Sequence, residues 1–126
     1  MLVLGRYNAT RPRDFELVAM RHRSLKVSFL TVHQSKGLEA DYVIILDVAA
    51  KRLGFPSRVE SDPLLTLVLP ADNEIRFAEE RRLFYVALTR ARHRVFVCAP
   101  SRAPSIFASE LELPEYDGLV SVAHGH

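Results

Sequence analysis

Cysteine is nearly absent from this sequence of 126 residues, which contains only Cys98. A lone cysteine excludes a disulfide framework and a cysteine-based metal site. Because Cys98 stands inside the apolar stretch "VFVCA", we expect a buried thiol in a reducing compartment, which favours a cytoplasmic protein. No apolar run approaches the roughly 20 residues that a bilayer-spanning helix needs, so we expect no membrane partner.

Several signatures of catalysis are missing as well. The phosphate-binding loop G-x-x-x-x-G-K-[ST] does not occur, so the chain lacks the main cradle for a triphosphate. No serine stands in the pattern G-x-S-x-G, which argues against a serine hydrolase. His33 and His93 do not share a metal-ligand spacing, and we assign no metal site.

Charge is small overall but unevenly distributed. The formal net charge is +2, yet arginine outnumbers lysine and gathers in residues 6–23 and 76–94. Arginine makes planar, bidentate contacts with phosphates and carboxylates, so these clusters favour an anionic partner. A solvated charged face is the alternative that the composition leaves open.

The apolar patterning predicts one α/β domain. With 126 residues and 48% apolar content, the chain can bury a single core. Its β-branched runs are apolar on both faces, which suits a mostly parallel sheet covered by helices, so we expect an α/β layered domain. We expect strands at 2–5, 26–32, 41–48 and 93–99, helices at 12–22, 73–92 and 103–111, and a long irregular loop at 51–73.

The polar stretch "HQSKGLEAD", residues 33–41, is the first candidate site. It leaves the carboxyl end of a predicted strand, which is where ligands bind in open α/β sheets. Gly37 permits a tight turn. Lys36 and His33 can contact a phosphate, and Glu39 can accept a hydrogen bond from a sugar hydroxyl. The alternative is a plain connection between strands, with charges that face water.

Arg90 is the second candidate. It extends the apolar stripe of the predicted helix 73–92, seven residues after Leu83. An arginine in such a place is costly to bury without an anion. One reading is a structural salt bridge, and the other is an arginine that meets a transferred phosphate, a role for which Arg92 is the rival. The acidic residues that could form the salt bridge are Glu79, Glu80 and Asp41.

"TVHQSKGLEAD" and "EERRLFYVALTRAR" together resemble motifs V and VI of the UvrD/Rep/PcrA class of superfamily-one DNA helicases. "GFPS", residues 54–57, resembles a short segment that these enzymes carry between the two motifs. The opening "LVLGRYNATRP" is similar to the strand that precedes their accessory insertion. The resemblance covers most of residues 2–99 and implies a RecA-like layered domain, the second of two motor domains.

This resemblance implies half of an ATP site. In the family, ATP binds between two RecA-like domains, and the first supplies the phosphate loop and the Mg²⁺-binding acids. That first domain lies outside this chain. The catalytic arginine of motif VI, which contacts the γ-phosphate, falls on Arg90. The ribose-binding glutamate of motif V falls on Glu39, and Gly37 shapes the turn beside it.

The DNA-binding residues implied by motif V are Thr31, His33 and Lys36, although Lys36 faces the nucleotide in an alternative reading. Residues 1–112 are then the C-terminal motor domain of an ATP-dependent 3′-5′ helicase that acts on single-stranded DNA and duplex junctions, and residues 113–126 a flexible tail. We expect the isolated chain to be inactive, because its ATP site is half complete. A standalone, non-catalytic module that binds nucleic acid or a protein is the alternative.

Overall fold

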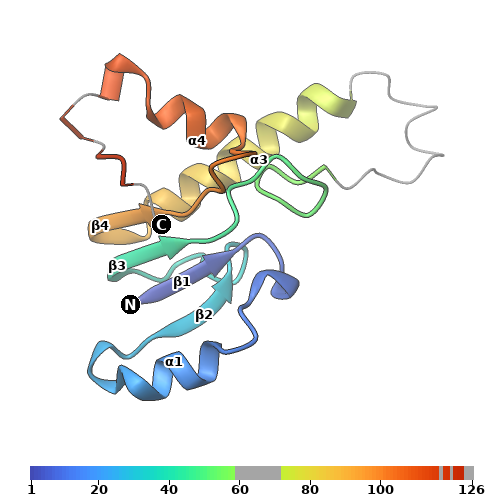
Figure 1. Ribbon diagram of the computed structural model, residues 1–126. Helices are drawn as coiled ribbons and strands as arrows, with labels where there is room; N and C mark the ends of the chain where they lie inside the picture. The colour runs from blue at the N-terminus through green and yellow to red at the C-terminus, as the bar shows by residue number, and fades with distance from the viewer. Residues whose placement is uncertain (59–71, 117, 120, 124–126) are drawn as a thin grey trace.

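A computed structural model describes residues 1–58, 72–116, 118–119 and 121–123. Along the chain the longer elements follow in the order strand, helix, strand, strand, helix, strand, helix (Figure 1). Short 3-10 turns lie at Asn8–Thr10, Arg23–Leu25 and Pro114–Tyr116. The longer elements are β1 Leu2–Gly5, α1 Phe15–Arg21, β2 Ser28–Thr31, β3 Ala40–Ile45, α3 Asp72–Leu88, β4 Ala91–Val97 and α4 Ile106–Leu111.

The strands form one sheet in the order β2-β1-β3-β4. Val3 is aligned with Phe29 on one side and with Ile44 on the other, and Ile44 is aligned with Phe96. Each of these pairs of strands is parallel, which confirms the predicted α/β layered architecture. The carboxyl ends of the strands therefore lie at one edge of the sheet, here called the carboxyl edge, and the amino ends at the other, the amino edge.

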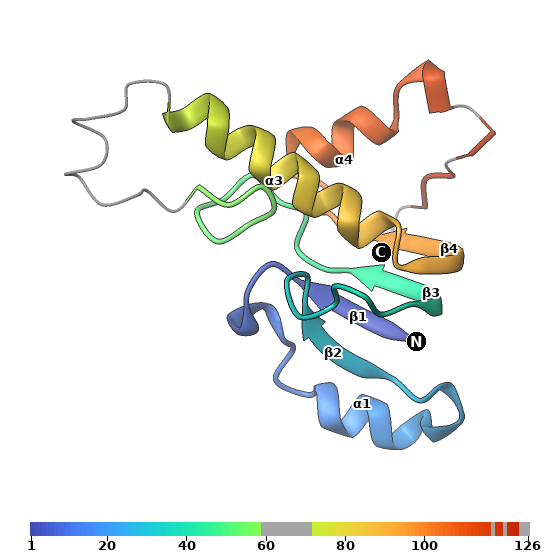
Figure 2. The same ribbon diagram turned by 180° about the vertical axis from the view of Figure 1, so that it is seen from behind.

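The larger core lies between the sheet and α3, which crosses one face of it (Figure 2). Val43 and Ile45 are fully buried on the strand side, and Phe84 of α3 is 5% exposed. Phe55, in the segment after β3, is also fully buried, and its ring lies 5.2 Å from that of Phe84 and 6.1 Å from that of Phe107. Edge-to-face packing of these rings ties the segment after β3 to α3 and α4.

A smaller core lies on the opposite face. Since Val3 and Phe29 are register partners, their side chains share a face, and the ring of Phe15 meets that of Phe29 at 6.0 Å. Phe15 begins α1, so the helix starts three residues later than the predicted start at Pro12. Val18, in the middle of α1, is 43% exposed.

The end of α3 also differs from the prediction. The helix ends at Leu88 rather than at Arg92, because the residues from Ala91 onward pair with β3 instead. Arg90 therefore lies in the connection between α3 and β4. Cys98 was predicted to be buried and is exposed: it lies one residue beyond the end of β4, which is an edge strand of the sheet.

The loop predicted at 51–73 is described only as far as residue 58, and α3 begins at Asp72. Residues 59–71 lie outside the described part of the chain. After α4, the 3-10 turn Pro114–Tyr116 opens the predicted tail, whose flexibility stays a prediction. No helix among the described residues is both long and apolar enough to cross a membrane.

Candidate functional site

The polar stretch between β2 and β3 crosses from one edge of the sheet to the other. β2 ends at Thr31 on the carboxyl edge, and β3 begins at Ala40 on the amino edge. Ser35 N donates to the Thr31 carbonyl oxygen over 3.1 Å, and Leu38 N donates to that of Ser35 over 3.0 Å. Gly37 has φ +79°, in the left-handed region that favours glycine. The predicted site residues are consequently divided between the two edges.

Thr31 is buried, with 9% of its surface exposed. Its backbone N–H donates to Gln34 Oε1 over 3.0 Å, and the N–H of Gln34 donates to Thr31 Oγ1 over 3.3 Å. This reciprocal pair satisfies backbone groups at the start of the turn. The contacts of Thr31 thus hold the turn that presents His33 to solvent.

A hollow of about 230 Å³ lies at the carboxyl edge, and His33 and Lys36 line it together with Arg6, which follows β1, and Arg82 of α3. Partial burial lowers the pKa of His33, and the positive charges of Arg6 and Lys36 lower it further. Both effects favour the neutral imidazole, which has one ring nitrogen to donate a hydrogen bond and one to accept.

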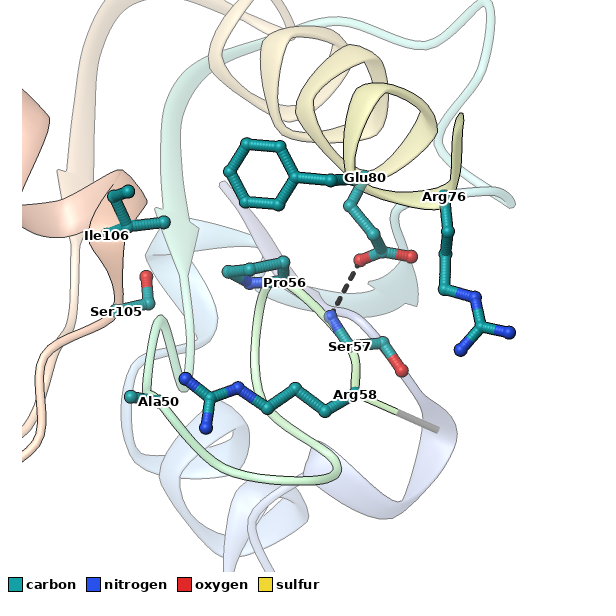
Figure 3. Close-up of a pocket in the computed structure, with 9 residues that line it drawn as sticks. Ala50, Pro56, Ser57, Arg58, Arg76, Glu80, Ser105 and Ile106 are labelled. Atoms are coloured by element: carbon teal, nitrogen blue, oxygen red, sulfur yellow. Dashed lines mark hydrogen bonds between the residues drawn. The ribbon is translucent and has the colours of Figure 1, made fainter. Parts of the chain in front are cut away.

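A second hollow, of about 470 Å³, shares Glu80 with the first (Figure 3). Arg58 and Arg76 lie on either side of Ser57 at its rim. Sequence reasoning did not single out Arg58 or this hollow. Two features of the sequence could have pointed to it: the resemblance of "GFPS" to a helicase segment, and the arginines clustered in residues 76–94. The other lining residues are Ala50, Pro56, Phe77, Ser105 and Ile106.

Glu80 connects the two hollows. Arg6 Nε donates to both carboxylate oxygens of Glu80 at 3.1 and 3.0 Å, and Arg6 Nη2 donates to Oε1 at 2.7 Å. The backbone N–H of Ser57 donates to Glu80 Oε2 over 2.9 Å. The hydroxyl groups of Tyr7 and Ser57 also form a hydrogen bond. Burial alone would lower the pKa of Arg6, but the hydrogen bond and charge of Glu80 raise it above its usual value.

Arg90 lies at the amino edge, one residue before β4. Its Nε donates to the Val86 carbonyl oxygen over 3.1 Å, its Nη1 to the Leu38 carbonyl oxygen over 3.3 Å, and its Nη2 to Thr89 Oγ1 over 3.3 Å. All three acceptors are uncharged. Within the described residues no carboxylate forms an ion pair with Arg90, so the salt-bridge reading finds no support there.

Glu39 is exposed and immediately precedes β3. The backbone N–H of Ala40 donates to the carbonyl oxygen of Arg90 over 2.9 Å, so Glu39 and Arg90 lie at the starts of neighbouring strands. Asp41, considered as a partner for Arg90, pairs with Arg92 at 3.0 Å instead. Both members of that pair are more than half exposed, which leaves Arg92 in a solvated surface contact.

This is an α/β RecA-like layered domain: its sheet is all parallel, α3 crosses one face, and candidate site residues lie at both the carboxyl edge and the amino edge. The chain belongs to the family described as "UvrD-like helicase C-terminal domain", whose model matches residues 13–102.

Several curated relatives are similar to it. DNA helicase IV of Escherichia coli (strain K12) is 43% identical over 112 residues, which is 89% of this chain and 16% of that protein. A probable DNA helicase II homolog of Mycoplasma capricolum is 36% identical over 73% of this chain and 12% of the relative.

The RecBCD enzyme subunit RecB of Haemophilus influenzae is 38% identical over 60% of this chain and 7% of its own length. The chain thus spans 16% or less of the length of each of these relatives.

Proposed function

We propose that this chain is the C-terminal motor domain of an ATP-dependent 3′-5′ DNA helicase, in which it completes an ATP site and contacts single-stranded DNA. The observation that carries the proposal is the division of the site between two edges. Arg90 and Glu39 lie at the amino edge, and the cationic hollows lie at the carboxyl edge. Helix α3 and the turn between β2 and β3 connect the two edges. The family and the helicases among its relatives support the same assignment.

The amino edge forms half of the ATP site. The neighbours of the Arg90 guanidinium are carbonyl and hydroxyl oxygens, so its charge is available to a γ-phosphate. An arginine in this role is worth ~10³–10⁵ in rate. Glu39 accepts hydrogen bonds from ribose hydroxyls, and Gly37 gives the turn beside it the required backbone conformation.

The other half of the site belongs to the first motor domain. The described residues contain no group of three histidine, cysteine or acidic side chains that could hold a metal ion. The ligands of Mg²⁺ and the phosphate loop would then come from that first domain, docked against the amino edge. ATP supplies the energy, and this chain contributes the arginine that senses the γ-phosphate.

The carboxyl edge forms the DNA surface. Single strands bind along cationic grooves that track the backbone, with bases stacked on apolar or aromatic groups. Lys36 neutralises a phosphate, and neutral His33 makes a hydrogen bond to a base or sugar. Thr31 acts by fixing the turn beside them. The two hollows are lined by five cationic side chains, Arg6, Lys36, Arg58, Arg76 and Arg82, and by two acidic ones, Glu79 and Glu80.

In the proposed cycle, nucleotide binding closes the first motor domain onto Arg90, and hydrolysis releases it. The repeated closure moves single-stranded DNA along the carboxyl edge toward a duplex junction. The standalone, non-catalytic module is not favoured, because the relatives are helicases. A cytoplasmic location stays a prediction from the sequence.

ATPase and unwinding assays on the full-length protein test this function. Duplexes with a 3′ single-stranded tail, with a 5′ tail and with blunt ends serve as substrates. We expect ATP-dependent unwinding of the 3′-tailed duplex and no activity from the isolated 126-residue chain. ATP hydrolysis by the isolated chain, or a preference for the 5′ tail, would contradict the proposal.

A further inference from the structure

Glu80 is a buried carboxylate in a surface that the proposed function assigns to DNA. Only 5% of the residue is exposed, although it contributes to the walls of both hollows. A negative charge beside a phosphate backbone opposes binding. Its neighbour Glu79 lines one of the same hollows and is exposed. The two adjacent glutamates therefore share a helix and a groove but differ in burial.

The contacts of Glu80 join three separate parts of the chain. The carboxylate belongs to α3, Arg6 follows β1, and Ser57 belongs to the segment after β3. Arg6 lines the hollow of His33 and Lys36, and Ser57 lines the second hollow. Figure 3 shows the contact between Glu80 and the backbone N–H of Ser57. Together with the contact to Arg6, it fixes the walls of both hollows relative to α3.

We propose that Glu80 is a positioning residue for single-stranded DNA: it holds Arg6 and the Ser57 segment so that the two hollows form one continuous binding surface. This inference rests on the proposed DNA-binding function of the carboxyl edge. The positioning benefit outweighs the repulsion between its charge and the DNA, because Arg6 and the Ser57 N–H already neutralise and bind the carboxylate.

The chemistry of the contacts requires a glutamate here. A carboxylate offers four lone-pair sites and can accept from a guanidinium fork and a backbone N–H together. Glutamine offers one oxygen, and its NH₂ group would face either Arg6 or the N–H of Ser57. Aspartate keeps the charge but is shorter by one methylene, so it cannot reach both donors from the same helix position.

The matched pair Glu80→Gln and Glu79→Gln tests the inference in the full-length protein. Each substitution removes one negative charge from the same groove. Simple electrostatics predicts tighter DNA binding for both. We expect tighter binding for Glu79→Gln but about tenfold weaker binding for Glu80→Gln, the factor that corresponds to one lost charge-assisted hydrogen bond. Fluorescence anisotropy with a labelled oligothymidylate gives the Kd, and stoichiometric titration gives the active fraction.

Glu80→Asp keeps the negative charge but shortens the side chain, so it tests side-chain length separately from charge. It also replaces Glu80→Gln as the test variant if Glu80→Gln folds poorly. It leaves the net charge unchanged, and we expect it to weaken DNA binding as well. If both Glu80 variants lower only the melting temperature or the active fraction, with Kd unchanged, Glu80 is merely structural and the inference is wrong. Tighter binding by Glu80→Gln would also overturn it. The double variant His33→Ala, Lys36→Ala is the reference: if it binds DNA as well as the unmodified protein, the proposed DNA surface itself fails.

Discussion

Arg90 Nη1 donates a hydrogen bond to the main-chain carbonyl of Leu38 over 3.3 Å, which joins the end of α3 to the turn before β3. The backbone N–H of Ala40 returns a hydrogen bond to the Arg90 carbonyl oxygen over 2.9 Å. These two contacts enclose Glu39, so the residues proposed for the γ-phosphate and the ribose are held together by one side-chain and one backbone hydrogen bond. The amino edge of the sheet therefore sets their relative position before any nucleotide binds.

The first prediction concerns Arg90. Arg90→Ala in the full-length protein should reduce DNA-stimulated ATP hydrolysis by ~10³ or more, because the γ-phosphate loses its guanidinium partner. The Kd for single-stranded DNA should stay the same, since Arg90 lies at the edge opposite to the hollows. Arg92→Ala is the matched control, because it removes a neighbouring arginine from an exposed pair with Asp41. Steady-state turnover with excess oligonucleotide measures both variants, and an undiminished rate for Arg90→Ala would refute its role.

Much of the fold could be predicted from local sequence pattern. The β-branched runs apolar on both faces predicted a parallel sheet, and β1 lies at the predicted residues 2–5. The end of α3 could not be predicted, because the helical spacing continues through Arg90 while residues 91–97 pair with β3. The exposure of Cys98 follows from the edge position of β4. Local sequence pattern could not predict that position, because the order of strands in a sheet is a tertiary property.

The residue composition of the candidate site could be taken from the sequence, but its layout could not, and the roles of its residues stay predictions. The turn that carries His33, Lys36 and Glu39 was identified from its residues, but the sequence located only its start, at the carboxyl end of a predicted strand. The structure shows that the turn crosses the sheet, because its end must reach the start of β3. The pairing of Glu80 with Arg6 joins residues 74 positions apart, and no local pattern predicts a contact at that separation.

The second prediction compares two glycines. At Gly37 an added Cβ meets no atom within 4 Å, so the cost of Gly37→Ala comes only from the left-handed backbone conformation, with φ +79°. We expect a loss of about 1–2 kcal/mol in the free energy of unfolding. At Gly54 an added Cβ would lie 2.1 Å from the carbonyl oxygen of Ala49, so Gly54→Ala must displace backbone and should cost more. Urea denaturation ranks the two variants, and the reverse order would contradict this explanation.

The third prediction concerns pH. Partial burial and the charges of Arg6 and Lys36 lower the pKa of His33, and the opposing charge of Glu80 does not restore it. The unfolded chain therefore takes up this proton first as the pH falls. The stability contribution is complete above an unfolded-state pKa of about 6.5 and is lost as the pH falls toward the lower folded-state value. His33→Gln should flatten the decline in unfolding free energy over this range. An unchanged pH dependence in that variant would show that other groups cause it.

The fourth prediction compares a buried and an exposed ion pair. The side chains of Arg6 and Glu80 are 17% and 7% exposed, and those of Arg81 and Glu110 are 48% and 33% exposed. Arg6→Ala leaves a buried carboxylate without its cation and should cost about 3 kcal/mol or more. Arg81→Ala breaks a solvated pair and should cost about 1 kcal/mol or less.

A double-mutant cycle checks the physical reason for that difference. If the cost of Arg6→Ala comes from the orphaned charge, adding Glu80→Ala should recover part of it, because no buried ion then remains. The cycle for Arg81 and Glu110 should show a much smaller coupling energy. Urea unfolding of the single and double variants, analysed with a common m-value, gives both coupling energies. Strictly additive losses at Arg6 and Glu80 would mean that the two side chains stabilise the domain independently of their pairing.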